Sequence, residues 1–214
     1  MTLEQMLSLA PVVPVLVIER PEDAVPLARA LVKGGLPLLE VTLRTPAALN
    51  CIARIAAEVE GAVVGAGTVR NEPALEAAVR AGARFAVSPG LSGAMVAAAG
   101  IPLLPGISTA TEAMAALEAG CTFVKLFPAE AVGGVKLLRA LGGPFPELTF
   151  CPTGGITADS APAYLAEPNV ACVGGAWVAP KTAIGAGDWL AIETLAGQAA
   201  RLTRRGASGQ SVAQ

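Results

Sequence analysis

The chain has 214 residues, of which 53% are hydrophobic, 4% aromatic and 15% charged, and its formal net charge is −2. A chain this apolar can bury a large core, and a near-neutral charge without a basic block argues against nucleic acid as a partner. The sequence contains no histidine, which excludes Ser-His-Asp and Cys-His catalysis and removes the commonest ligand of catalytic zinc. Acid–base chemistry at neutral pH would therefore depend on carboxylate, lysine, tyrosine or cysteine side chains.

Short apolar runs without polar alternation recur along the chain, as is typical of parallel strands that are buried on both faces. They predict eight strands, at residues 13–18, 38–43, 62–67, 85–88, 103–105, 123–127, 148–152 and 171–174. Helical patterns with start and stop signals lie between them. Asn71 is predicted to cap one helix, and Thr109 with Glu112 has the spacing of a capping box at the start of another.

Eight strands that are each followed by a helix predict an α/β fold, a closed (β/α)₈ or TIM barrel, with a short N-terminal helix at residues 2–10 across its bottom. A doubly wound open sheet is the alternative. Such a sheet usually has a glycine-rich turn after its first strand, whereas this strand runs into Glu19-Arg20-Pro21-Glu22. We expect one domain over residues 1–214, with a polar tail after about residue 205.

The start of the chain lacks the pattern of a signal peptide, and no apolar run is long and unbroken enough to span a bilayer. We therefore expect a cytoplasmic protein with reduced thiols and no membrane partner. The four cysteines form no CxxC pair, and the simplest interpretation makes them small buried residues: Cys51, Cys121, Cys151 and Cys172.

Lys125 lies inside an apolar strand, whereas the other three lysines have ordinary positions at a helix end, on a helix or in a loop. Burial of an ammonium ion is costly, so burial favours the neutral amine, which is the form that attacks a carbonyl. The sequence thus makes Lys125 the candidate nucleophile. The alternative is a structural lysine that pairs with an internal carboxylate.

Glu40 lies in another apolar strand and is expected to project into the barrel, where loss of water would suit a shared acid and base role. The alternative is a simple counter-ion for Lys125 or Arg44. Arg44, at the end of the same strand, could hold a carboxylate through two parallel hydrogen bonds, unless it is an ordinary surface arginine.

Glycines at the ends of three strands indicate where a ligand could approach the backbone. After the third strand, Gly65-Ala66-Gly67 leads to Thr68, which adds a hydroxyl. The pairs Gly154-Gly155 and Gly174-Gly175 follow strands seven and eight, where barrels commonly hold phosphate with backbone N–H groups. Turns that require positive φ are the alternative explanation for these glycines.

Six segments together resemble the 2-keto-3-deoxy-6-phosphogluconate (KDPG) aldolase family, which is also described as 4-hydroxy-2-oxoglutarate (KHG) aldolase. They are EVTLRT at 40–45, VGAGTV at 64–69, FAVSPG at 85–90, PGIST at 105–109, KLFPAE at 125–130 and CPTGGI at 151–156. The resemblance extends from about residue 11 to residue 180. It implies a class I aldolase that cleaves KDPG or KHG and releases pyruvate.

The resemblance also implies roles for individual residues. Lys125 would form the Schiff base, and Glu40 would be the general acid and base. The other implied contacts are the pyruvyl carboxylate for Arg44 and Thr68, the pyruvyl methyl for Pro89 and Phe127, and the substrate phosphate for Gly154 and Gly155. The family is typically a homotrimer and needs no metal or other cofactor.

Two positions depart from the pattern of the family. Ala176 replaces a serine whose hydroxyl usually helps to hold the phosphate, and Val17 stands where some members have an arginine. These departures leave the preference for a phosphorylated substrate open. Among enzymes, the alternative is the same chemistry on the galactonate epimer of KDPG or on a 2-keto acid without phosphate. A non-catalytic barrel that binds a phosphosugar is the alternative from another functional class.

Overall fold

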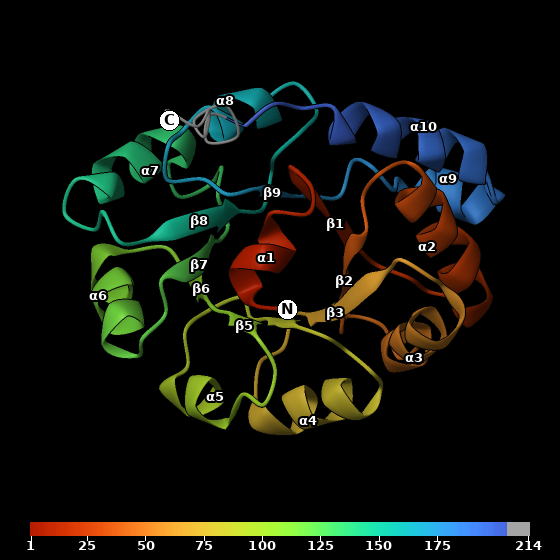
Figure 1. The fold of residues 1–214 in the computed structure, drawn as a ribbon, viewed down its shortest axis with the longest axis horizontal. Coiled ribbons are helices and arrows are strands. Elements are labelled where there is room, and N and C mark those ends of the chain that lie inside the picture. The colour runs from red at the N-terminus through yellow and green to blue at the C-terminus, as the bar shows by residue number, and fades with distance from the viewer. Residues whose placement is uncertain (205–214) are drawn as a thin grey trace, which may run out of the picture.

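Parallel strands curl around a common interior, and helices cover the outer side of the sheet (Figure 1). The computed structural model describes residues 1–204, so the predicted polar tail lies outside the described residues. The strands are β1 (Val12–Leu16), β2 (Leu38–Thr42), β3 (Val63–Gly67), β4 (Ala86–Val87), β5 (Leu103–Leu104), β6 (Gly106–Ile107), β7 (Phe123–Leu126), β8 (Thr149–Pro152) and β9 (Val173–Gly175). All their pairings are parallel, which confirms the predicted α/β class.

Helices alternate with these strands along the chain, as the sequence predicts. They are α1 (Leu3–Leu7), η1 (Pro21–Asp23), α2 (Ala24–Lys33), α3 (Ala48–Glu58), α4 (Glu72–Arg80), α5 (Gly93–Ala98), α6 (Ala110–Glu118), α7 (Gly134–Gly142), α8 (Ala161–Leu165), α9 (Lys181–Ala186) and α10 (Trp189–Ala200). None of the helices among the described residues is both long and apolar enough to cross a membrane.

The strands form two groups that adjoin at both edges. One group has the order β5-β4-β3-β2-β1-β9, and the other has the order β6-β7-β8. Only Pro105 separates β5 from β6. The predicted strand 103–105 ends at this residue, which has no N–H to donate, and β6 continues beyond the predicted end. At the other edge, single parallel bridges join Phe150 to Val170 and Thr153 to Gly174.

Along each strand, side chains point alternately towards the helices and towards the interior. In β2, Leu39 and Val41 belong to the large apolar cluster beneath the helices, whereas Leu38 belongs to a smaller cluster in the interior. Because side chains alternate along a strand, Glu40 and Thr42 also face the interior. On the interior face of β2, the polar side chains of Glu40 and Thr42 therefore lie nearer the carboxyl-terminal end of the strand than the apolar side chain of Leu38.

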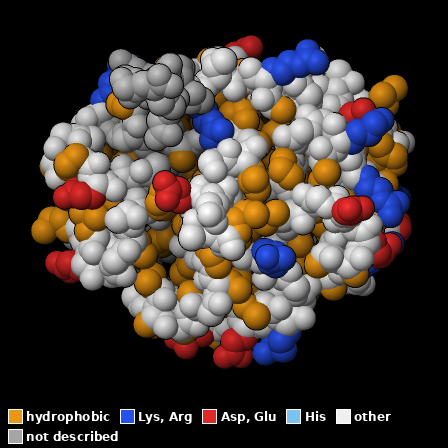
Figure 2. Space-filling model, viewed as in Figure 1, with side chains coloured by type: hydrophobic (Ala, Val, Ile, Leu, Met, Phe, Trp, Pro, Cys, Tyr) orange, Lys and Arg blue, Asp and Glu red, His pale blue; other side chains and the backbone are white. Residues whose placement is uncertain are grey.

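Helix α1 covers the amino-terminal ends of the strands, where the sequence predicts a helix at residues 2–10 (Figure 1). The observed helix is shorter than the predicted one. Met6 and Leu7 are each only 2% exposed and pack into the interior cluster beside Leu38. In the same orientation, Figure 2 shows uncharged side chains over most of this face, with single acidic and basic side chains both near its middle and at its rim.

Three of the four cysteines are buried, as the sequence predicts, and Cys121 departs from the prediction. Cys51, Cys151 and Cys172 are buried, Cys121 is half-buried, and all four are free thiols. Burial raises the pKa of Cys51 and of Cys121, which keeps both in the unreactive thiol form. Cys151 and Cys172 lie together in the interior, with their sulfur atoms 3.5 Å apart.

Both predicted helix caps are present. Asn71 Oδ1 accepts a hydrogen bond of 2.9 Å from the N–H of Ala74, and Thr109 Oγ1 accepts one of 3.2 Å from the N–H of Glu112. The carboxylate of Glu112 reaches the N–H of Ser108 at 2.7 Å, one residue before the cap itself. The start of α6 is therefore an extended form of the predicted capping box.

We expect Asn71→Ala to lower the free energy of unfolding by about 1 kcal/mol, because it removes the acceptor that satisfies the first turn of α4. Asn71→Asp retains that acceptor and should leave the stability near that of the parent protein. Urea denaturation of both variants measures the difference. Equal losses in the two variants would contradict a stabilising role of the cap.

Candidate active site

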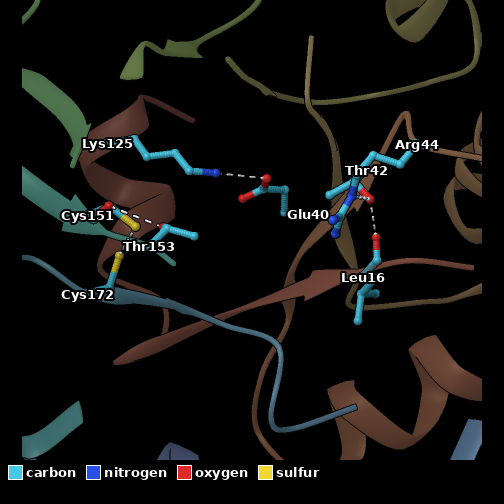
Figure 3. Close-up of polar contacts among 8 residues, drawn as sticks. All are labelled: Leu16, Glu40, Thr42, Arg44, Lys125, Cys151, Thr153 and Cys172. Carbon is cyan, nitrogen blue, oxygen red and sulfur yellow. Dashed lines mark hydrogen bonds and ion pairs between the residues drawn. The ribbon is translucent and has the colours of Figure 1, made fainter. Parts of the chain in front are cut away.

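A buried ion pair joins two strands that do not pair with each other. Lys125 Nζ of β7 lies 3.2 Å from Glu40 Oε1 of β2, and the two residues are 5% and 3% exposed (Figure 3). Both side chains occupy the interior face of their strands. The structure therefore brings together the predicted nucleophile and the predicted acid and base.

Two neighbours hold this pair in place. A Cβ atom at Gly67 would overlap the carboxylate of Glu40, so only glycine leaves room for that carboxylate. On the other side, Lys125 Nζ lies 5.3 Å from the centre of the Phe127 ring, close enough for a cation–π interaction. The glycine that the sequence analysis assigned to ligand approach thus serves to accommodate Glu40.

Thr42 connects Arg44 to the backbone of β1. Its Oγ1 donates a 2.8 Å hydrogen bond to the carbonyl of Leu16 and accepts a 3.1 Å bond from Arg44 Nε (Figure 3). Thr42 is 2% exposed, whereas Arg44 is exposed and lies two residues beyond the end of β2. Sequence reasoning missed Thr42, although its position two residues after Glu40 on the same strand face could have identified it.

The segments that follow β3 and β4 add two hydroxyl residues and a proline near the site. Thr68 follows β3 directly and has a φ of 60°, which is costly for a β-branched residue and often marks a functional position. Pro89 follows β4 and is half-buried. The neighbouring Ser88 is fully buried, and its hydroxyl donates a 2.7 Å hydrogen bond to the carbonyl of Gly90, which fixes this turn.

The two glycine pairs lie beside each other, and each pair requires glycine for a different reason. Gly154 and Gly155 have φ values of 106° and 80°, so this turn requires glycine. Gly174 and Gly175 belong to β9, where added Cβ atoms would overlap the side chains of Thr153 and Trp177. The bridge between Thr153 and Gly174 places the two pairs on neighbouring segments, as their positions in the sequence predict.

A cavity of about 620 Å³ opens beside the pair of Lys125 and Glu40. Its lining consists of Val15, Val17, Arg44, Ala176, Trp177, Ala179, Pro180 and Lys181. Val15 is the neighbour of Glu40 in the register of β1 and β2, so the cavity adjoins the ion pair. Among the described residues that line it, the charged ones are Arg44 and Lys181, which are both cations, and this charge suits an anionic ligand.

The arrangement is suited to amine chemistry on a carbonyl. Transfer of one proton from Lys125 to Glu40 across 3.2 Å would give a neutral amine beside a carboxylic acid. A neutral amine can attack a carbonyl carbon, and an adjacent carboxyl group can supply and remove the protons. Among residues 1–204, no group of three or more Cys, Asp or Glu side chains is placed to hold a metal ion.

Comparison with known proteins assigns a family to the chain. A family model described as KDPG and KHG aldolase matches residues 3–195. The 2-dehydro-3-deoxy-phosphogluconate aldolase of Pseudoalteromonas atlantica is 52% identical over 92% of this chain and 93% of its own. The KHG/KDPG aldolase of Escherichia coli is 51% identical over the same shares of the two chains.

A solved structure agrees with this assignment. The KDPG aldolase of Legionella pneumophila, with pyruvate captured at low pH as a covalent carbinolamine intermediate, has a TM-score of 0.90 and 43% identity. The match covers 92% of this chain and 97% of the Legionella chain. The sequence, the fold and the buried lysine–carboxylate pair therefore agree, and the chain belongs to the KDPG and KHG aldolase family.

Proposed function

We propose that this protein is a class I aldolase in which Lys125 forms a Schiff base with a 2-keto acid. The substrate is KDPG, which gives pyruvate and glyceraldehyde 3-phosphate, or KHG, which gives pyruvate and glyoxylate. The observation that carries the proposal is the buried contact of 3.2 Å between Lys125 Nζ and Glu40 Oε1. The carbinolamine captured in the Legionella relative supports the same chemistry.

In the proposed reaction, neutral Lys125 attacks the C2 ketone of the substrate. Loss of water then gives an iminium ion, which accepts the electron pair that is released when the bond between C3 and C4 breaks. Glu40 removes the proton of the C4 hydroxyl, directly or through water, and the aldehyde leaves. The remaining enamine is protonated at C3, and water hydrolyses the iminium to release pyruvate and restore the amine.

The other candidate residues would bind the two ends of the substrate. Arg44, which Thr42 orients, and Thr68 would hold the pyruvyl carboxylate, because a guanidinium and a hydroxyl both donate to carboxylate oxygens. Pro89 and Phe127 would contact the pyruvyl methyl group. The phosphate would meet the backbone N–H groups of the glycine pairs at 154–155 and 174–175.

We also propose that the strands close into a single-domain (β/α)₈ barrel and that the protein assembles as a cytoplasmic homotrimer. The short break at Pro105 and the bridges from β8 towards β9 support closure of the sheet. The family resemblance implies the trimer, and a mean hydropathy of +0.59 supports the burial of apolar surface between subunits.

Borohydride reduction in the presence of pyruvate should leave a stable pyruvyl adduct on Lys125, because reduction traps the iminium. Mass mapping of peptides identifies the modified lysine. Lys125→Ala should form no adduct and should lose roughly 10⁴-fold or more of kcat/KM, because the nucleophile is absent. An adduct on another lysine, or binding of pyruvate without any adduct, would refute the Schiff-base assignment and favour a non-catalytic barrel.

Removal of Lys125 alone leaves the Glu40 carboxylate buried without its partner, a change that typically costs about 3–5 kcal/mol. The double variant Lys125→Ala with Glu40→Gln keeps the interior neutral and is the control for folding. It should remain folded by circular dichroism and still form no adduct. Lys136→Ala, which removes an exposed lysine of α7, should leave both the adduct and the activity unchanged.

Glu40→Gln should lower kcat/KM for KDPG by about 10²–10⁴-fold, because the amide cannot exchange the protons that cleavage requires. The amide oxygen can still accept a hydrogen bond from Lys125, so the pyruvyl adduct should form, although more slowly. Steady-state kinetics and borohydride trapping measure the two effects. Glu76→Gln, at an exposed carboxylate of α4, is the control, and equal kinetics in the two variants would exclude Glu40 as the acid and base.

A further inference from the structure

A tyrosine–carboxylate hydrogen bond links α8 to the segment that follows Lys125. Tyr164 Oη donates to Glu130 Oε1 at 2.7 Å. Tyr164 is only 2% exposed, so its hydroxyl needs a partner to offset the loss of water. Burial, and after it the bond to Glu130, raises the pKa of Tyr164, so the phenol remains a protonated donor.

The same segment supports the glycine turn after β8. The N–H of Ala129 donates to the carbonyl of Thr153 at 2.8 Å, and the N–H of Glu130 donates to the carbonyl of Gly154 at 3.1 Å. An added Cβ atom at Gly155 would lie 2.7 Å from the Cβ of Glu130. The glycine turn therefore rests directly on the backbone and side chain of this segment.

Tyr164 also limits the start of α7. Gly134 has a φ of 56°, and an added Cβ atom there would lie 2.8 Å from Tyr164 Oη. The N–H of Gly134 in turn donates to the carbonyl of Ala129 at 2.9 Å. The Tyr164 hydroxyl thus lies where the segment after β7, the first residue of α7 and the helix α8 meet.

We propose that Tyr164 and Glu130 are a positioning pair that fixes the Gly154–Gly155 turn relative to Lys125. Glu130 lies five residues after Lys125, and Tyr164 lies on the first helix after the glycine turn. Their hydrogen bond therefore connects the segment that follows Lys125 to the segment that follows the turn. This inference rests on the proposed roles of Lys125 and of the glycine turn.

The pair should affect only substrates that occupy both ends of the site. A phosphorylated substrate is held at Lys125 and at the glycine turn together, so a change in their spacing misaligns it. A substrate without phosphate is held only at its pyruvyl end, by Lys125, Arg44 and Thr68, and makes no contact with the turn. The role is therefore visible as a change in preference for phosphate and not as a general loss of activity.

The experiment compares two aldehydes that differ only in phosphate. The condensation of pyruvate with glyceraldehyde 3-phosphate and with glyceraldehyde is followed in the parent protein and in Tyr164→Phe. We expect kcat/KM for the phosphorylated aldehyde to fall about tenfold, mainly through a higher KM. The reason is that the hydrogen bond between Tyr164 and the charged Glu130 is lost, so the glycine turn is no longer held in place relative to Lys125. The value for glyceraldehyde and the rate of pyruvate trapping on Lys125 should stay within about twofold.

Four further variants separate positioning from stability. Glu130→Gln keeps an acceptor for the phenol and should retain most of the preference for phosphate. Glu130→Ala should match Tyr164→Phe, and the double variant should lose little more, because both changes break one interaction. Glu167→Gln weakens the 2.6 Å ion pair with Arg139 of α7 and should lower stability without changing the preference.

Equal losses for both aldehydes, or no loss for either, would overturn the positioning role. A parent protein that shows no preference for the phosphorylated aldehyde would overturn it as well. Failure of pyruvate trapping in the parent protein would instead refute the proposed function, and that measurement comes first. Because Glu130 is exposed, Glu130→Ala breaks the same hydrogen bond without a change in the core and remains informative if Tyr164→Phe does not fold.

Discussion

The ion pair between Lys125 and Glu40 is the constraint around which the interior is organised. Both charges have lost most of their water, and their mutual attraction offsets that loss only while each keeps its partner. Gly67 accordingly has no side chain, and Phe127 presents its ring to the ammonium group. The proposed chemistry uses the same closeness, since one proton transfer within the pair creates the nucleophile.

Much of the fold could be predicted because its signals are local. Uninterrupted apolar runs marked the strands, and Asn71 and Thr109 marked helix starts, since caps depend on residues within one turn. The continuation of the predicted strand 103–105 as β6, beyond Pro105, was missed. The proline is visible in the sequence. Whether its missing N–H interrupts a strand depends on whether a neighbouring strand would accept a hydrogen bond there, and that is set by tertiary structure.

The candidate site was partly predictable for a related reason. Lys125 and Glu40 were conspicuous because charged residues rarely occur within apolar strands. The reason for Gly67 was missed, because a clash with Glu40 becomes visible only in three dimensions. The bond between Tyr164 and Glu130 was also missed: Glu130 ends the KLFPAE segment, but its partner is 34 residues away and lies in none of the six segments.

Helix α1 has a consequence for the order of events in catalysis. With Met6 and Leu7 filling the amino-terminal end of the interior, the site has its entrance at the carboxyl-terminal ends of the strands. Both products of a cleavage at Lys125 would leave through that entrance. In the proposed reaction the aldehyde is not bonded to the protein, whereas pyruvate is still attached to Lys125, so the aldehyde would leave first and the keto acid last.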